Sequence, residues 1–176
     1  MWYEIILSVR SMVRRRNLNT GIGVQIQVPQ QLQSIFLMKR VLFLCTHNSA
    51  RSQMAEALLR HLGGSNYEVY SAGLEKTFVR PLAIQVMSEI GIDISHQESK
   101  SLKQYLQNNF DEVITVCDDA NESCPVFPHA KNRRHWSFPD PSKAKGSNSE
   151  QLKVYRQVRD AIKLKIEKEL LINILC

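Results

Sequence analysis

A short apolar run, Val41-Leu42-Phe43-Leu44, ends directly in a polar segment that extends from Cys45 to Arg51. A continuous apolar run of this length is typical of a strand buried on both faces of a parallel sheet. After the polar segment, apolar residues recur at helical spacing until Gly63-Gly64 stops the pattern. These apolar positions are Ala55, Leu58, Leu59 and Leu62. The sequence therefore predicts a buried strand, a short loop and a helix that begins near Ser52.

Predicted strands and helices continue to alternate along the chain. A second strand is predicted over residues 67–72, and Pro81 can open a helix to Ile90, because proline is favoured at the first helical position. Further strands are predicted over 112–116 and near His135–Phe138, followed by one long amphipathic helix from Leu152 to Leu170. Strands that alternate with helices predict an α/β fold, here a three-layer α/β/α sandwich with a central parallel sheet of four strands.

The chain of 176 residues has the size of one domain, which we assign to residues 38–176. Residues 1–37 show no clean periodicity and are predicted to be an N-terminal extension outside the fold. Met38-Lys39-Arg40 stands immediately before the first strand and resembles an ordinary translation start. We therefore favour a mis-assigned upstream start over an Arg-rich organellar transit peptide.

The net charge of +6 does not indicate a nucleic-acid partner. Half of it lies in residues 1–37, and the remaining domain is only mildly basic, without an interleaved aromatic and basic stripe. No apolar run approaches the length of a membrane span. Four cysteines without a recognisable secretory signal favour reduced, reactive thiols over a disulfide framework. We expect a cytoplasmic monomer with neither nucleic-acid nor membrane partners.

The polar segment has the features of an anion-binding loop. Backbone N–H groups of Thr46, His47, Asn48, Ser49 and Ala50, together with the positive end of the following helix, would face one point that can hold a tetrahedral oxyanion. Arg51 adds a guanidinium group that can grip two oxygens at once. The same positive field favours a Cys45 thiolate, which Ser52 could stabilise by a hydrogen bond. Asn48 tolerates the left-handed backbone that such a loop often requires.

The segment C-T-H-N-S-A-R-S after V-L-F-L, followed by Q-M-A-E-A, resembles the low-molecular-weight protein tyrosine phosphatase superfamily, and the resemblance covers nearly all of residues 38–170. It implies that Cys45 attacks the oxyanion and that Arg51 holds it. It further implies that Asp140, in Asp140-Pro141, is the general acid that protonates the leaving oxygen.

Two more cysteines lie after the third predicted strand: Cys117, at its end, and Cys124, seven residues later. This pattern resembles the thioredoxin-coupled arsenate reductases of the superfamily, which use three thiols in sequence. The resemblance implies that Cys45, Cys117 and Cys124 reduce arsenate to arsenite for detoxification by a thiol-disulfide relay. Thioredoxin, or glutathione with glutaredoxin, would be the external reductant, and no bound cofactor is expected.

Alternatives remain for both the pair and the whole protein. Cys117 and Cys124 could be incidental thiols or zinc ligands. The main alternative function is a tyrosine phosphatase that hydrolyses phosphotyrosine through a cysteinyl-phosphate. Against it, the residues after Asp140-Pro141 are Ser142-Lys143-Ala144, whereas a resemblance to the phosphatase branch would imply a pair of tyrosines there. A noncatalytic redox or anion sensor that uses Cys45 as a switch would not need Asp140.

Two finer expectations follow. If residues 118–123 are helical in the reduced protein, the Cα atoms of Cys117 and Cys124 stand about 10.5 Å apart, beyond the roughly 7 Å that a disulfide tolerates. Oxidation must then remodel this segment.

The resemblance also implies a potassium site of Asn, Glu, Ser and Asp in some reductases. Asn48, Glu56 and Ser71 match three of these, but Lys100 stands in place of the Asp. A fixed ammonium could replace the ion, and no bound metal is predicted.

Overall fold

The computed structural model describes residues 38–117, 127 and 129–171. Four strands form one sheet: β1 (Lys39–Cys45), β2 (Tyr67–Gly73), β3 (Phe110–Thr115) and β4 (Ala130–His135). Their order across the sheet is β2-β1-β3-β4, and all pairings are parallel. The predicted four-stranded parallel sheet is confirmed, and β1 occupies an interior position with neighbours on both sides.

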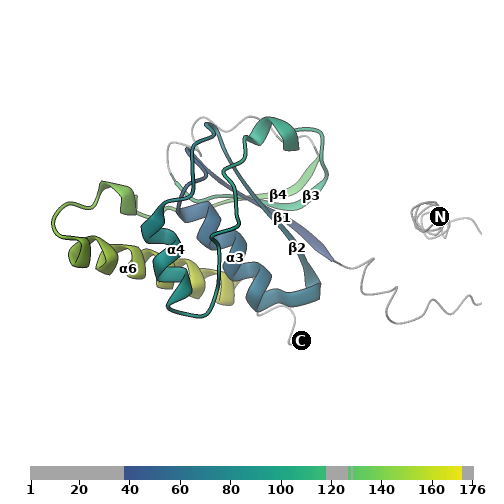
Figure 1. Cartoon of the computed structure of the whole chain (residues 1–176). Coiled ribbons are helices and arrows are strands. Elements are labelled where there is room, and N and C mark those ends of the chain that lie inside the picture. The colour runs from purple at the N-terminus through teal and green to yellow at the C-terminus, as the bar shows by residue number, and fades with distance from the viewer. Residues whose placement is uncertain (1–37, 118–126, 128, 172–176) are drawn as a thin grey trace, which may run out of the picture. The chain divides into compact units, whose positions relative to one another are not determined.

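Three helices cover one face of the sheet: α3 (Arg51–Gly63), α4 (Pro81–Ser88) and α6 (Asn148–Ile166) (Figure 1). A turn of π-helix over Glu167–Leu171 continues α6. Side chains of β1 alternate between the two faces, as the pleat of a strand requires. Val41 and Phe43 pack against the helices, whereas Leu42 and Leu44 pack on the other face. That second face is covered among the described residues by a short 3-10 helix (Leu102–Tyr105) and Phe127.

The start of α6 has a clear local cause. Ser147 accepts a hydrogen bond from the backbone N–H of Glu150, and the Glu150 carboxylate accepts one from the Ser147 backbone. This reciprocal capping box satisfies two backbone donors that a helix start leaves unpaired. The helix therefore begins at Asn148, four residues before the first apolar position of the predicted amphipathic pattern.

The prediction for the fourth strand is wrong in its bounds. It placed the strand near His135–Phe138, whereas β4 spans Ala130–His135 and shares only His135 with that range. Among the described residues, β4 is an edge strand that pairs with β3 alone, and its side chains from Lys131 to Arg133 are exposed and polar. Such charged edges discourage pairing with other chains but leave no apolar signature. Trp136 and Phe138, which lie in the predicted range, are buried after β4 ends.

Within the part of the chain that the structure describes, no helix is both long enough and apolar enough to cross a lipid bilayer. The predicted extension, residues 1–37, lies outside the described residues.

Candidate active site

Cys45 is the last residue of β1, and the loop that follows folds back over its sulfur. The backbone N–H of Asn48 donates a hydrogen bond of 3.0 Å to Cys45 Sγ. This turn requires Asn48 to adopt a φ of 47°, the single positive φ of a non-glycine residue in the described part of the chain. Asparagine tolerates that left-handed conformation better than most residues. The backbone expectation for Asn48 is therefore confirmed.

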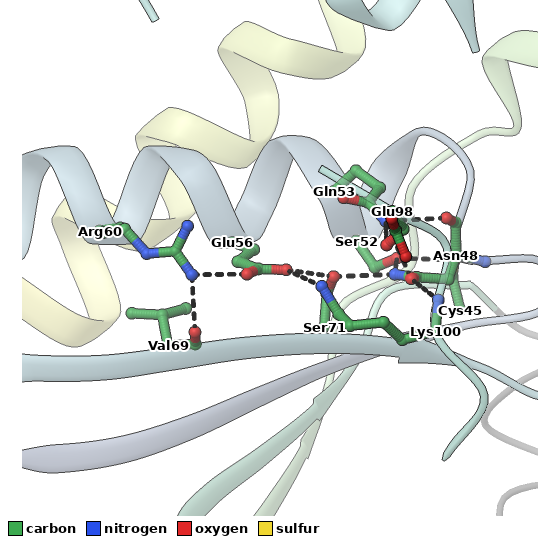
Figure 2. Close-up of polar contacts among 10 residues, drawn as sticks. All are labelled: Cys45, Asn48, Ser52, Gln53, Glu56, Arg60, Val69, Ser71, Glu98 and Lys100. Carbon is green, nitrogen blue, oxygen red and sulfur yellow. Dashed lines mark hydrogen bonds and ion pairs between the residues drawn. The ribbon is translucent and has the colours of Figure 1, made fainter. Parts of the chain in front are cut away.

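Ser52, in the first turn of α3, lies 2.9 Å from Cys45 Sγ through its hydroxyl oxygen. The same oxygen accepts a hydrogen bond of 2.8 Å from the side-chain amide of Asn48 (Figure 2). Because the amide supplies one proton to Ser52, the serine's own proton is free to point at the sulfur. The geometry thus provides two donors to Cys45, the Asn48 backbone and the Ser52 hydroxyl.

Burial raises the pKa of the Cys45 thiol, which is only 3% exposed. The hydrogen bond from Ser52 lowers this pKa and Arg51 does so more weakly, but neither restores the ordinary value, and the neighbouring Cys117 raises it further. Burial thus opposes the readily formed thiolate that the loop pattern predicts, and that expectation stays a prediction. The loop pattern shows the donors to the sulfur, whereas the loss of water around it depends on packing.

Replacing Ser52 with alanine is expected to raise the pKa of Cys45 further, because the mutation removes a hydrogen bond that favours the thiolate. Alkylation of Cys45 by iodoacetamide at pH 7 should slow by roughly tenfold, the effect of one hydrogen bond to a charged group. The rate is measured as a function of pH by mass spectrometry of the tryptic peptide 41–51. An alkylation profile identical to that of the wild type would show that Ser52 does not act on the sulfur.

Arg51 is the first residue of α3, and its guanidinium group points to the segment that follows β4. One nitrogen donates a hydrogen bond of 3.1 Å to the Phe138 carbonyl, and another lies 3.3 Å from a carboxylate oxygen of Asp140. Phe138 is held by edge contact with Trp136, which itself packs on Phe43 of β1. The aromatic core thus positions the carbonyl that orients Arg51.

Asp140 caps the short 3-10 helix Pro141–Lys143 by accepting hydrogen bonds from the backbone and hydroxyl of Ser142. Burial raises the pKa of Asp140, but the Ser142 hydrogen bonds and the charges of Arg51 and Lys143 outweigh burial, so the pKa is lowered. Without an anion, Asp140 is a carboxylate paired with Arg51. An oxyanion that engages Arg51 and brings negative charge would weaken the effect of the positive charges on the pKa of Asp140. Under this condition Asp140 could hold a proton.

Cys117 follows β3 as Cys45 ends β1, so both thiols lie at the same edge of the sheet. Both are buried and free of disulfides. A hydrogen bond of 3.3 Å joins the Thr46 hydroxyl to Cys117 Sγ. Cys117 also lines a pocket of about 170 Å³ together with Arg51, Asp140 and Lys143 and the segment Ser137–Pro139. Cys124 and the remodelling predicted for residues 118–123 lie outside the described residues.

The remaining predicted loop residues divide into buried and exposed. Ala50 is buried, Thr46 and Ser49 are half-buried, and His47 is exposed. The His47 imidazole lies 3.5 Å from the Glu75 carboxylate, at the rim of the loop. Its carbonyl accepts hydrogen bonds from the Thr77 and Ser99 hydroxyls, which tie the loop to neighbouring segments.

Gln53 is a supporting residue that sequence reasoning missed. Its side-chain amide is buried and donates to the backbone oxygen and the side-chain oxygen of Asn48 and to the Glu98 carbonyl (Figure 2). It belongs to the Q-M-A-E-A segment that carries the family resemblance, yet no local rule indicates that a helix residue turns back to hold the preceding loop. Behind the loop, the ammonium of Lys100, which stands in place of the Asp that the resemblance implies, lies 3.1 Å from Glu56. The described residues contain no cluster of three or more His, Cys, Asp or Glu side chains suited to a metal ion.

Gly73, at the end of β2, backs closely onto the loop. A Cβ atom there would lie 2.7 Å from the Asn48 backbone nitrogen and 2.7 Å from the Glu75 carbonyl. We expect Gly73→Ala to destabilise the protein by about 1–3 kcal/mol, the usual cost of overpacking, and to weaken phosphate binding by displacing Asn48. Urea unfolding and phosphate titration measure both effects. Gly64→Ala is the control, because its Cβ would meet open space and only its positive φ is strained. Wild-type stability and affinity in Gly73→Ala would contradict this account.

The fold and the loop define a class of α/β proteins in which a buried thiol at the end of an inner strand faces backbone and hydroxyl donors beside an arginine. The low molecular weight phosphotyrosine protein phosphatase family matches residues 40–173, and the chain belongs to this family.

Its relatives include several arsenate reductases. The arsenate reductase of Shouchella clausii (strain KSM-K16) is 47% identical over 130 residues, which cover 74% of this chain and 94% of that protein. A solved structure described as an arsenate reductase in the phosphate-binding state has a TM-score of 0.65 at 37% identity and covers 74% of this chain and 95% of its own. The thioredoxin-dependent arsenate reductase of Corynebacterium glutamicum has a TM-score of 0.52 at 31% identity, over 77% of this chain and 71% of that one.

Proposed function

We propose that this protein is an arsenate reductase that converts arsenate to arsenite with the thiols of Cys45, Cys117 and Cys124. The observation that carries the proposal is the second buried free thiol, Cys117, next to the loop of Cys45. Phosphate-ester hydrolysis needs one thiol, whereas reduction by two electrons needs a second thiol to complete a disulfide. The identity with arsenate reductases supports the same choice.

In the first step, Cys45 forms a bond to arsenic and one As–O bond breaks. Arsenate is a base that can accept the thiol proton, so the raised pKa of Cys45 does not prevent attack once the substrate is in the loop. The loop N–H groups and Arg51 hold the remaining oxygens. The departing oxygen leaves as water, with its proton delivered through Asp140. The product is a thiol-bound arsenic in its original oxidation state.

In the second step, Cys117 attacks Cys45. A disulfide bond forms, the S–As bond breaks, and its electron pair stays on arsenic, which leaves as arsenite. The two sulfurs have each lost one electron and arsenic has gained two, so the electrons balance. The hydrogen bond between the Thr46 hydroxyl and Cys117 holds Cys117 next to the loop for this attack.

In the third step, Cys124 attacks Cys117 and returns Cys45 to its free thiol. The new disulfide is then reduced by an external dithiol protein. We favour a reductant of the thioredoxin type over glutathione with glutaredoxin, because one similar protein is described as thioredoxin-dependent. The relay needs a compartment that keeps thiols reduced, so we assign the protein to the cytoplasm, in the detoxification of arsenic.

The function is tested by incubating the protein with arsenate, thioredoxin, thioredoxin reductase and NADPH, and measuring arsenite. Continuous arsenite formation is expected, with little hydrolysis of a phosphotyrosine peptide. Rapid hydrolysis of the peptide without arsenite formation would establish the phosphatase alternative.

We also propose that residues 38–176 are sufficient for this activity. The family match begins at residue 40, within this range. A variant that begins at Met38 is expected to keep kcat/KM within about twofold, because none of the proposed reacting groups precedes Cys45. The same arsenite assay compares it with the full chain. A loss of tenfold or more would assign residues 1–37 a role in activity.

A further inference from the structure

A continuous series of polar contacts extends from Cys45 to two cations behind the loop (Figure 2). Its far end is Glu56 of α3, whose side chain is only 6% exposed. One oxygen of Glu56 contacts Arg60, one helical turn later, and the other lies 3.1 Å from the Lys100 ammonium. A buried carboxylate is costly unless cations and hydrogen bonds compensate its charge. Arg60 is half exposed, whereas the Lys100 side chain is 24% exposed, so Lys100 is the more sheltered of the two cations.

The direction of each hydrogen bond between Glu56 and Ser52 is determined. Ser71 of β2 donates its single proton to Glu56, so its oxygen can only accept the bond of 2.8 Å from the Asn48 amide. That amide has two protons, and the second goes to Ser52. The Ser52 proton is then left for Cys45, 2.9 Å away. The Glu56 carboxylate and the orientation of the Asn48 amide together therefore set which way the Ser52 hydroxyl points.

Lys100 holds this arrangement at two places. Its ammonium binds Glu56, and its backbone N–H donates a bond of 2.7 Å to the side-chain oxygen of Asn48. The backbone bond fixes which end of the Asn48 amide faces the two serines. The ammonium holds the carboxylate oxygen that accepts from Ser71.

We propose that Lys100 is a positioning residue for Cys45: its ammonium group anchors Glu56 and, through Ser71 and Asn48, keeps the Ser52 hydroxyl directed at the sulfur. Lys100 contacts no reacting atom, and its effect on arsenate turnover rests on the proposed function. The effect of Lys100 on the Cys45 sulfur does not rest on the proposed function, since this effect is present in the protein without substrate.

Other charged groups also face the two ends of the series. Arg51 and Cys117 act electrostatically on Cys45, and Glu56 acts on Tyr105. These groups stay in place when Lys100 is changed. A change in the alkylation profile of Cys45 after substitution of Lys100 then comes from the series of hydrogen bonds or from the loss of the Lys100 charge itself, and a double variant distinguishes the two.

The test is the pH profile of Cys45 alkylation by iodoacetamide, read from the tryptic peptide 41–51 without arsenate. Lys100→Met is expected to move the midpoint of the profile to higher pH and to slow alkylation at pH 7 at least about threefold. Lys100→Arg should restore most of the rate, since it keeps the charge. Lys103→Met is the matched control, because Lys103 is exposed, lies nearby and is not part of the series. It should leave the profile unchanged.

A double variant separates positioning from a general loss of stability. Lys100→Met combined with Ser71→Ala is expected to have the profile of Ser71→Ala alone, because both residues act through one path. Additive shifts would overturn the proposal. So would an unchanged profile in Lys100→Met with only a lower melting temperature. If Lys100→Met does not fold, Lys100→Gln, which keeps a donor without the charge, is expected to show the same shift. Because no arsenate is used, failure here is distinct from failure of the proposed reaction.

Discussion

Replacing Cys45 with serine is expected to reduce arsenite formation by at least about 10⁴-fold, since removal of a catalytic nucleophile in comparable enzymes costs up to about 10⁶-fold. A serine hydroxyl can neither form the S–As bond nor supply electrons to arsenic. The donors around the loop remain, because Asn48 and Ser52 are held by contacts that do not involve the Cys45 sulfur. Phosphate should therefore bind to Cys45→Ser within a few-fold of its wild-type affinity.

Arsenite release in the thioredoxin-coupled assay and phosphate titration measure the two effects separately. Cys176→Ser is the control, as this cysteine at the end of the chain has no assigned part in the relay. Its rate should equal that of the wild type. Substantial arsenite formation by Cys45→Ser would mean that another thiol attacks the substrate.

Replacing Arg51 with lysine is expected to lower kcat/KM for arsenate by about 10²–10³-fold, the usual loss when an oxyanion-stabilising donor is removed. Lysine keeps the positive charge but cannot present two parallel N–H groups to two oxygens. It also cannot reach Phe138 and Asp140 at once with the geometry of the guanidinium group. The loss should therefore appear even though the net charge of the site is unchanged.

Steady-state kinetics with arsenate measure this loss. Arg156→Lys is the matched control, because Arg156 makes two bonds to Glu89 on an exposed surface away from the loop. It should change kcat/KM by less than about twofold, as expected of an exposed ion pair. A similar small effect in Arg51→Lys would show that the charge alone is needed.

The arrangement of the strands and the position of the two buried thiols are predictable from local sequence patterns. The run Val41–Leu44 predicts an inner parallel strand because buried strands need apolar side chains on both faces, and the structure confirms it. The return of a cysteine after the third strand places Cys117 at the same edge as Cys45, because the carboxyl ends of parallel strands coincide.

Other features depend on contacts between distant segments and leave no local pattern. The charged residues of β4 are equally typical of a loop, and their strand conformation depends on pairing with β3. The raised pKa of Cys45 results from burial beneath the surrounding core, and the support from Gln53 and Lys100 depends on segments 45–52 and 97–100 meeting in space. Burial and long-range hydrogen bonds are properties of the assembled fold, so a helical or strand period does not report them.

The three-thiol relay is tested most directly by the amount of arsenite released when reduced protein meets excess arsenate without any external reductant. The wild type and Cys124→Ser are each predicted to release about one arsenite per chain, because the Cys45 to Cys117 disulfide completes one reduction in both. Cys117→Ser should release almost none, since its arsenic stays bound to Cys45. Release of about one arsenite per chain by Cys117→Ser, or none by the wild type, would contradict the relay.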